Sequence, residues 1–260
     1  MARREELTDE QWSLIESLFD KPPTIQTRGR PRRPDREVLN GVLWILRSGA
    51  RWCDLPDRFP PYQTCHRRFQ QWVKDGRLER VLETLAEDLR TKGELDLSEC
   101  FIDGTFIVAK KGAAKFGKTK RGKGTTRVAV ADSAGFPVAV YTASAAPHEV
   151  TLVRKTLVER FTDEKPERLI GNKAYDSDPL DADLEALDIE MITPHKSNRQ
   201  KAKTQDGRKL RRYRRRWKVE RLFAWLQNYR RILVRYEYHD ANYLGFVHLG
   251  CILILLRAYF

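Results

Sequence analysis

One acidic residue stands inside a strongly basic stretch of the chain. Glu220 belongs to RRYRRRWKVERLFAWLQNYRRI, residues 211–232, which predicts an amphipathic helix. On such a helix Tyr213, Arg216 and Glu220 lie at positions i, i+3 and i+7 and share one side. A carboxylate in these surroundings is either a salt-bridge partner or a metal ligand held beside a polyanion. Taken alone, the stretch favours a solvated charged helix.

Two further polar residues follow short apolar runs. Residues 100–102 predict a buried strand that ends at Asp103 and Gly104, and residues 168–171 predict another that leads directly to Asn172. In sheets with parallel neighbours, ligands collect at the ends of the strands. An acid beside glycine at such an edge is therefore well placed to face a ligand.

These strands belong to a predicted α/β domain over residues 96–260. Runs at 128–131 and 137–142 indicate a hairpin, helices are expected at about 148–161 and 179–187, and a last strand at 189–193. The order of strands and helices predicts a mixed sheet flanked by helices.

Residues 1–95 predict an all-α region instead. Apolar residues at helical spacing indicate helices from Thr8 or Asp9 to about Lys21, and over residues 36–48, 62–74 and 77–90. The turn between the second and third helices is typical of a helix-turn-helix, whose second helix can read base edges in DNA. Its outward polar residues are expected to be Gln63, Thr64, His66, Arg67, Arg68 and Gln71. Any small helical bundle has a polar face, so this pattern is weak by itself.

Three segments concentrate positive charge. Residues 27–35 form a proline-containing arm typical of minor-groove readers, with a flexible linker as the alternative. Residues 110–127 hold eight basic residues and no acid, and residues 196–218 hold twelve basic residues and one acid. We expect phosphate contacts there. Together with Arg230, the expected DNA contacts are Arg28, Arg30, Arg32, Arg33, Lys118, Lys120, Arg121, Lys123, Arg211, Arg212, Tyr213, Arg215 and Arg216.

The composition agrees with a nucleic-acid partner. A formal net charge of +13, from 49 basic and 36 acidic residues, attracts polyanions at long range. The four cysteines form no CxxC pair, which indicates reduced thiols in the cytoplasm. The most apolar segment, residues 244–256, is shorter than the roughly 20 residues that span a bilayer, so we expect a buried helix and no membrane.

Motifs in both parts of the chain resemble the DDE transposases of bacterial insertion sequences, in particular the insertion-sequence-five group and its relatives in group four. LTDEQW, GRPRRPDREVLNGVLWILRSGARWCDLP and QTCHRRFQQW carry the resemblance in the first part, and FIDGTF, NKAYDSD and RRWKVERLFAWL carry it in the second. The resemblance covers essentially the whole chain. It implies a helix-turn-helix region for transposon ends and an RNase H-like catalytic domain with two Mg²⁺ ions, for which Mn²⁺ can substitute.

The resemblance places the catalytic, metal-binding positions at Asp103, Asn172 and Glu220. Asn172 departs from the family pattern, which has aspartate there, and a neutral amide ligates a metal only weakly. We therefore expect strongly impaired cleavage. The change resembles a deliberate inactivating substitution, with a naturally inactive copy as the alternative, and Asp176 is a conceivable substitute ligand.

The family also has a tyrosine, an arginine and a glutamate at fixed spacing, which this chain satisfies with Tyr213, Arg216 and Glu220. Related proteins often carry a basic residue seven positions after the glutamate. This chain has Gln227 there, and Arg230 or Arg231 is a candidate replacement.

The leading hypothesis is a transposase that cuts and joins double-stranded DNA at the inverted repeats of its element. Two ends must be paired, which implies a homodimer, and the setting would be the bacterial cytoplasm at the nucleoid. A domesticated or decayed DNA-binding protein without catalysis is the second hypothesis, favoured by Asn172. An RNA-processing nuclease on the same fold is the third.

Overall fold

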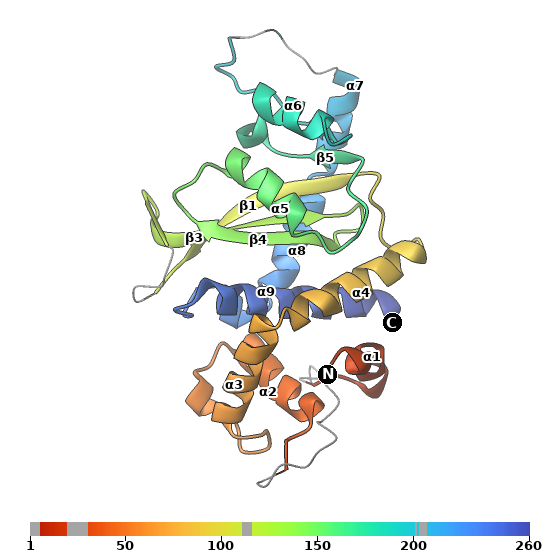
Figure 1. Ribbon diagram of the computed structural model, residues 1–260. Helices are drawn as coiled ribbons and strands as arrows, with labels where there is room; N and C mark the ends of the chain where they lie inside the picture. The colour runs from red at the N-terminus through yellow and green to blue at the C-terminus, as the bar shows by residue number, and fades with distance from the viewer. Residues whose placement is uncertain (1–5, 20–30, 111–115, 201, 203–206) are drawn as a thin grey trace.

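The first region is helical, as the sequence predicts. The computed structural model describes residues 6–19, 31–110, 116–200, 202 and 207–260 (Figure 1). Helix α1 is capped by Thr8, whose hydroxyl accepts the N–H of Gln11 while the Gln11 side chain accepts the N–H of Thr8. Helix α2 ends at Gly49, whose φ of +71° suits glycine. The elements of this region are α1 (Asp9–Ile15), η1 (Glu16–Leu18), α2 (Asp35–Ser48), η2 (Trp52–Asp54), α3 (Tyr62–Lys74) and α4 (Arg77–Thr91).

The second region contains one mixed sheet. Its strands are β1 (Cys100–Val108), β2 (Gly117–Thr119), β3 (Gly122–Ala131), β4 (Pro137–Ser144), β5 (Arg168–Ile170) and β6 (Glu190–Ile192). The order β2-β3-β1-β5-β6 places β1 in the middle, and β4 also pairs with β3. Strand β1 is antiparallel to β3 and parallel to β5, which is parallel to β6. The predicted hairpin turn is present at Asp132, whose buried carboxylate accepts the N–H groups of Ala134 and Phe136.

Helices cover both faces of this sheet. On one face α5 (Val153–Val158), which follows η3 (Glu149–Leu152), packs on β3 and β4, and on the other α8 (Trp217–Leu226) packs on β1 and β3. Figure 1 shows α5 in front of the strands and α8 behind them. The short η4 (Lys173–Tyr175), α6 (Asp178–Glu185) and α7 (Gly207–Leu210) lie near the β5 and β6 side. This arrangement confirms the predicted mixed sheet flanked by helices.

The last long helix, α9 (Asp240–Leu255), connects the two regions. It packs against α2, α3 and α4 as well as β4. Its Phe246 ring lies 4.4 Å from that of Phe69 and 5.9 Å from that of Trp52, measured between centroids. The segment Asp240–Tyr259 is long and apolar enough to cross a membrane, but 72% of its most apolar window is buried inside the protein. The buried C-terminal helix is thus confirmed, and one hydrophobic core runs through both regions.

The structure corrects the prediction of one continuous helix over residues 211–232. The segment consists of η5 (Arg211–Arg215), α8 and η6 (Arg230–Ile232), and the chain ends in α9 and η7 (Leu256–Tyr259). Crowded arginines repel one another along a regular helix. Beyond α8, the chain turns so that the Tyr229 side chain is buried and η6 packs against α2.

A substitution in α9 tests whether the two regions form one cooperative unit. We expect Phe246→Ala to lower the free energy of unfolding by about 3–5 kcal/mol, because a fully buried ring between both regions is lost. Urea unfolding followed by both tryptophan fluorescence and circular dichroism should give one shared transition. Tyr238→Ala, at a ring that is 62% exposed, is the control and should change the free energy by less than about 0.5 kcal/mol. Two separate transitions would show that the regions unfold independently.

Candidate active site

The site forms where strands β1 and β5 separate. Their parallel pairing covers only Cys100 with Leu169 and Phe101 with Ile170. Asp103 lies two residues further along β1, and Asn172 lies two residues beyond the end of β5. The sheet therefore brings together two polar side chains that are 69 residues apart in sequence.

Asn172 faces Asp103 through its nitrogen. Its Oδ1 accepts the N–H of Ala174 at 2.6 Å, and its Nδ2 donates to Oδ1 of Asp103 at 2.8 Å. The same Asp103 oxygen accepts the N–H of Gly104 at 2.9 Å. Because the backbone N–H of Ala174 requires an acceptor, the amide cannot rotate without losing that bond. A hydrogen-bond donor thus stands at the second acidic position of the family pattern.

Arg216 joins Asp103 to Glu220. Its guanidinium contacts Oδ2 of Asp103 at 2.8 Å and Oε1 of Glu220 at 2.6 Å. It also lies 5.6 Å from the ring centroid of Tyr213, so the three residues of the predicted tyrosine-arginine-glutamate pattern lie together although the helix is interrupted. The Glu220 side chain remains 52% exposed. Arg216 therefore joins Asp103 to Glu220, and Asn172 belongs to the same group through its hydrogen bond to Asp103.

The charge of Asp103 is under opposing influences. Burial raises the pKa of its carboxyl group, since an ion is poorly solvated there. The N–H of Gly104, the guanidinium of Arg216 and the amide of Asn172 act in the opposite direction, and the pKa remains raised. A further cation near Asp103 would favour its ionised form.

The side chains around Asp103 suit a divalent ion on the Glu220 side and do not suit one on the Asn172 side. Asp103 and Glu220 offer carboxylate oxygens, the ligands that Mg²⁺ prefers, and they already share a positive group in Arg216. Asn172 offers N–H groups towards Asp103, which cannot ligate a cation. Within the described part of the chain, no three His, Cys, Asp or Glu side chains converge at metal-binding distance.

Asp176 is directed elsewhere. Its carboxylate accepts the N–H of Lys196 at 2.7 Å, contacts His195 at 2.9 Å and pairs with Arg199 at 2.9 Å. Burial would raise the pKa of Asp176, but these three partners outweigh it and hold the pKa below its usual value. The geometry therefore argues against the conceivable role of Asp176 as a substitute metal ligand and gives it a part in fixing residues 195–199.

The predicted reading face of α3 is only partly exposed. Gln63, Arg67 and Gln71 are exposed. The structure corrects the outward position expected for Arg68, whose side chain is 11% exposed and pairs with Asp35 on α2. His66 is also partly covered, with its ring stacked 4.7 Å from that of Trp52. Thr64 is intermediate in exposure.

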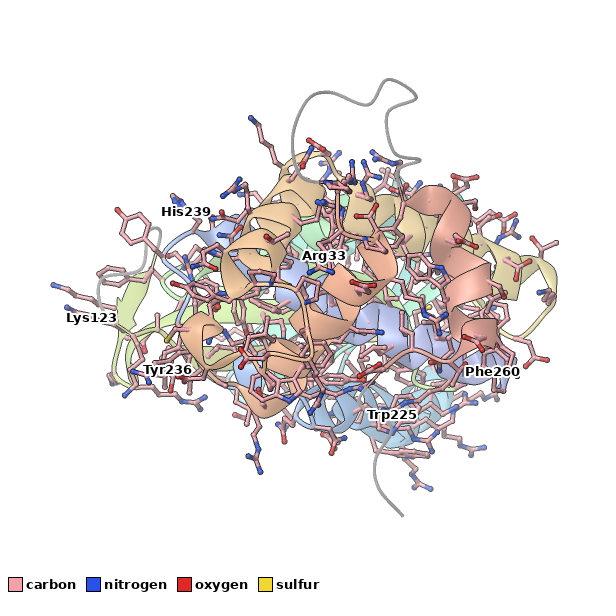
Figure 2. All side chains as sticks on the ribbon, turned by 90° about the horizontal axis from the view of Figure 1, so that it is seen from below. Arg33, Lys123, Trp225, Tyr236, His239 and Phe260 are labelled. Atoms are coloured by element: carbon pink, nitrogen blue, oxygen red, sulfur yellow. The ribbon has the colours of Figure 1, made fainter. Side chains whose placement is uncertain are left out.

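The basic hairpin of β2 and β3 presents exposed positive charge. The exposed side chains are Lys118, Lys120, Arg121 and Lys123. Figure 2 shows Lys123 on the same side of the molecule as Tyr236 and His239. The rings of Tyr236 and Tyr238 are 54% and 62% exposed. Cations next to exposed aromatic rings are suited to contact nucleic acid.

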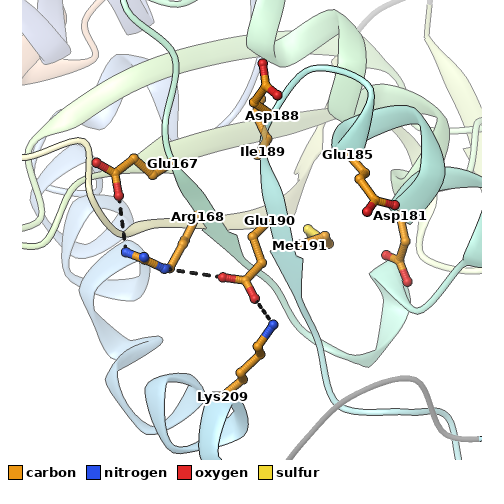
Figure 3. A pocket seen from close by; sticks show the side chains of 9 residues that line it. All are labelled: Glu167, Arg168, Asp181, Glu185, Asp188, Ile189, Glu190, Met191 and Lys209. Atoms are coloured by element: carbon orange, nitrogen blue, oxygen red, sulfur yellow. Dashed lines mark hydrogen bonds and ion pairs between the residues drawn. The ribbon is translucent and has the colours of Figure 1, made fainter.

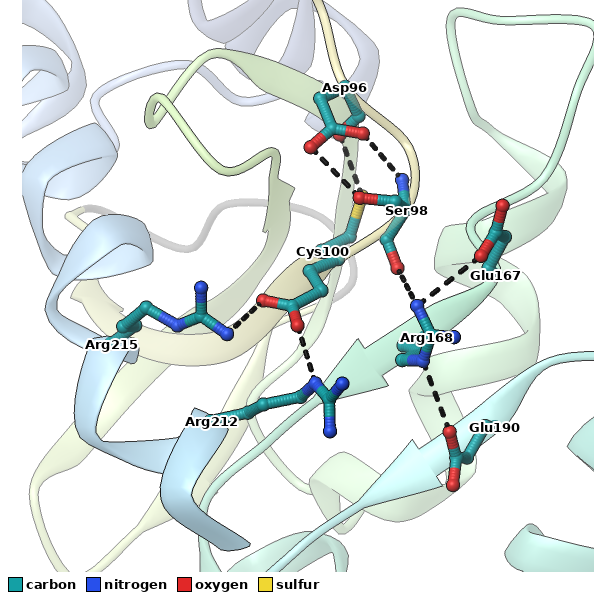
Figure 4. Close-up of polar contacts among 9 residues, drawn as sticks. Asp96, Ser98, Cys100, Glu167, Arg168, Glu190, Arg212 and Arg215 are labelled. Carbon is teal, nitrogen blue, oxygen red and sulfur yellow. Dashed lines mark hydrogen bonds and ion pairs between the residues drawn. The ribbon is translucent and has the colours of Figure 1, made fainter. Parts of the chain in front are cut away.

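Several other predicted DNA contacts are engaged in ion pairs. Arg212 and Arg215, both labelled in Figure 4, each lie 2.5 Å from a carboxylate oxygen of Glu99. Nearer the N-terminus, Arg32 pairs with Asp35 at 3.0 Å. Exposed Arg33 lies 3.9 Å from Glu37. Arg28 and Arg30 lie outside the described residues, and Arg211 is exposed.

The two candidates for the basic residue missing at position 227 differ. Arg230 is exposed, whereas Arg231 is buried, with Nε 2.7 Å from Glu237 and a hydrogen bond to the carbonyl of Ala50. The structure therefore favours Arg230 as the residue that can reach a phosphate.

An acid-rich cavity of about 520 Å³ lies away from this centre, along β6 and α6 (Figure 3). Its Glu190 already pairs with Arg168 at 3.3 Å and with Lys209. Burial raises the pKa of its Asp181 to about 6. The cavity shares no residue with the Asp103 centre.

Glu149 is an acid near the centre that the sequence analysis did not single out. It begins η3, and its carboxylate lies against Gly104, directly after Asp103. The available signal was an acid following a strand-like run, the same signal that marks Asp103. Four residues separate it from the end of β4, so the sequence alone gave only a helix start.

Comparison with known families and proteins agrees with this geometry. Residues 7–82 match the family described as "Putative transposase of IS4/5 family", and residues 94–256 match the family described as "Transposase DDE domain". An insertion element IS402 protein of 16.2 kDa from Burkholderia cepacia is 34% identical over 44% of this chain and 80% of its own length. A putative transposase of insertion sequence element IS6501 from Brucella ovis is 37% identical over 34% of this chain and 67% of its own length.

A solved structure of similar fold is a piggyBac transposase synaptic complex with hairpin DNA. It has a TM-score of 0.50 and 10% identity, over 98% of this chain and 73% of that one. At this identity the likeness concerns the fold alone, and it supports an RNase H-like arrangement of the sheet. The second family match covers more than half of the chain and contains all three predicted catalytic positions. The chain therefore belongs to the DDE transposases of insertion sequences.

Proposed function

We propose that this transposase binds the ends of its insertion sequence and catalyses metal-dependent strand cleavage and strand transfer, with activity strongly impaired by Asn172. The observation that carries the proposal is the convergence of Asp103, Asn172 and Glu220 from three separate segments: Arg216 contacts both acids, and Asn172 donates a hydrogen bond to Asp103. A salt-bridged surface helix would not require its glutamate to lie beside Asp103, inside the central strand β1, which continues to Val108 beyond the strand end predicted from the sequence.

The carboxylates of Asp103 and Glu220 are the groups that would hold a divalent ion. Such an ion, when bound, activates the attacking oxygen and stabilises the leaving oxygen at phosphorus. The residues of the chain prepare this arrangement. The N–H of Gly104 orients the Asp103 carboxylate, and Arg216 holds both acids in place while remaining able to bind a phosphate oxygen.

Asn172 supports a second candidate function, a transposase-derived DNA-binding protein without catalysis. The amide offers a hydrogen-bond donor to Asp103 where a second carboxylate would offer charge. We expect binding and catalysis to be separable in this chain, because Asn172 lies outside the basic hairpin and α3.

We propose that DNA is held by contacts of two kinds. The exposed side chains of α3 and the arm before α2 read the element ends, and the β2–β3 hairpin with residues 211–216 neutralises phosphates. Two copies of the chain would pair two ends of double-stranded DNA, next to the target DNA, at the bacterial nucleoid.

Restoring the acid at position 172 tests the proposal directly. We expect Asn172→Asp to raise Mg²⁺-dependent cleavage of DNA carrying the element ends by about 100-fold or more, because a charged ligand replaces an N–H donor. Mn²⁺ should support the same reaction. Cleavage is measured on labelled DNA, and end binding by fluorescence anisotropy.

The matched control adds Asp103→Asn to the Asn172→Asp chain and should abolish cleavage while DNA binding persists. If Asn172→Asp binds the ends but does not cleave them with either metal, the catalytic proposal is wrong and the DNA-binding function stands. Efficient cleavage by the unchanged chain would instead contradict the inactive alternative.

Arg216→Met tests the charge balance of the centre. Two carboxylates then lack their shared cation, so we expect a loss of about 1–2 kcal/mol in unfolding free energy in the presence of EDTA, with the exposure of Glu220 limiting the effect. Mg²⁺ should restore part of this stability and should raise the melting temperature of the variant more than that of the unchanged chain. Exposed Arg211→Met is the control. Equal Mg²⁺ responses in the two chains would argue against an ion between these acids.

The hairpin makes a separate prediction about salt. Affinity for DNA should fall about 10³-fold or more between 50 and 200 mM salt. Removal of one exposed cation by Lys123→Ala should lower the slope of log affinity against log salt by about 1. Lys92→Ala is the control, because Lys92 is paired with Asp88 on α4. A slope unchanged by Lys123→Ala would remove this residue from the interface.

A further inference from the structure

A short segment after η6 extends the sheet beside the far end of β1. The N–H of Arg235 donates to the carbonyl of Val108, and the N–H of Lys110 donates to the carbonyl of Arg235, both at 2.9 Å. Ala109 forms a parallel bridge with Arg235 and donates its own N–H to the carbonyl of Lys123 on β3. The segment therefore lies one strand away from β3, which carries the basic hairpin.

Side chains in this segment alternate between buried and exposed positions. Arg235 and Glu237 are 0% and 8% exposed, whereas Tyr236 and Tyr238 are 54% and 62% exposed. Such alternation is the pattern of an extended chain with one covered face, and side chains two residues apart on one face lie about 7 Å from each other. The two tyrosine rings are therefore presented together on the outer face.

Buried charges fix the backbone that carries the two tyrosines. The Arg235 guanidinium donates to Oγ1 of Thr125 at 2.8 Å, to the carbonyl oxygen of Glu237 at 3.2 Å and to that of Tyr238 at 3.1 Å. The Glu237 carboxylate pairs with Nε of buried Arg231 at 2.7 Å. Buried charges are costly unless they are paired and hydrogen-bonded, so these contacts favour one conformation of the segment. A preformed backbone lowers the entropy cost of binding a ligand.

The surroundings of the tyrosines are positively charged. The guanidinium carbon of Arg231 lies over the Tyr236 ring, 5.6 Å from its centroid. Lys123 lies on the same side of the molecule as Tyr236 and His239 (Figure 2). Three further cations of the hairpin, at residues 118, 120 and 121, are exposed. A ligand that suits these rings and charges is flat enough to stack and negatively charged.

Unpaired DNA combines these two properties. A base offers a flat face that stacks on an aromatic ring, and the phosphate beside it is attracted by lysine and arginine. Inside a duplex both faces of a base are covered by its neighbours in the stack, so only unpaired bases can lie against the tyrosines. Ala109 is six residues beyond Asp103, which corresponds to about 20 Å along an extended chain. The rings would thus meet a strand several nucleotides away from the catalytic centre.

We propose that Tyr236 and Tyr238 form a stacking platform for unpaired bases of a DNA strand, beside the phosphate contacts of the basic hairpin. This inference rests on the proposed DNA-binding function and adds single-stranded DNA to the forms of DNA that the chain holds. The platform tolerates any base, because every base has a face that can stack.

The experiment measures binding of fluorescein-labelled oligo-dT of about 15 nucleotides, which cannot pair with itself, to the full chain in EDTA. A blunt duplex of the same length is the comparison. We expect Tyr236→Ala and Tyr238→Ala each to weaken oligo-dT binding at least about fivefold in fluorescence anisotropy at fixed salt, because a stacking surface is lost. The affinity for the duplex should change less than about twofold.

Two kinds of control accompany these variants. Tyr236→Phe and Tyr238→Phe keep the ring and remove only the hydroxyl group, so they should stay within about twofold of the unchanged chain. Phe260→Ala removes a ring that is 68% exposed and lies on the opposite side of the view in Figure 2 from Lys123 and Tyr236. It should leave both affinities unchanged. Thermal unfolding of each variant verifies the fold.

Unchanged oligo-dT affinity in both alanine variants overturns the inference. An equal loss of affinity for oligo-dT and duplex also overturns it, since the rings would then contact duplex DNA. Reduced self-association of the alanine variants in sedimentation, with unchanged oligo-dT binding, would instead assign the tyrosines to an interface between two copies of the chain.

The outcome is separable from that of the proposed function, because the binding measurement needs neither metal nor cleavage. Tyrosine-dependent oligo-dT binding without cleavage by Asn172→Asp would support the platform and refute catalysis. Cleavage by Asn172→Asp, with oligo-dT binding that does not depend on the tyrosines, would do the reverse.

Discussion

The shared guanidinium of Arg216 is the interaction on which the centre depends. Asp103 comes from the central strand and Glu220 from a helix on one face of the sheet, and both carboxylates contact the same cation. Without it, the two acids, one of them in the central strand β1, would repel each other. The arginine thus allows the two acids to lie close together in the folded protein, and it leaves one of them, Glu220, open to solvent.

Much of the fold could be predicted from the sequence because its signals are local. The bounds of α2, α3 and α4, the hairpin at Asp132, and strands β5 and β6 all follow from apolar periodicity and turn residues. The break of the 211–232 segment could not be predicted, because it depends on what η5 and η6 contact in three dimensions, such as Glu99 and α2. The core shared by the two regions could not be predicted for the same reason. The sequence of α9 indicates a buried helix, but tertiary packing determines which elements it contacts.

The same distinction between local sequence signals and tertiary contacts applies to the candidate site. Asp103, Asn172 and Glu220 could be placed by the resemblance of their motifs, and the structure brings them together. The sequence could not show which nitrogen or oxygen of Asn172 faces Asp103, nor that Arg68 is tied to Asp35, since both depend on contacts across more than 30 residues. Glu149 could not be identified from the sequence, because its closeness to Asp103 arises from the missing side chain of Gly104, and no sequence pattern reveals such a contact.

The hydrogen bond between Ala174 and Asn172 has an evolutionary consequence. An aspartate could accept the same N–H, so residue 172 can change between amide and acid without disturbing the turn. The atom that differs is the one facing Asp103, where nitrogen donates a hydrogen bond and a carboxylate oxygen would be repelled by the Asp103 carboxylate. The contact with Asp103 is thus more favourable for asparagine than for aspartate when no cation is present. The codons of the two residues differ by a single base. A chain with asparagine at this position keeps the turn at residues 172–174, and one base change restores the acid.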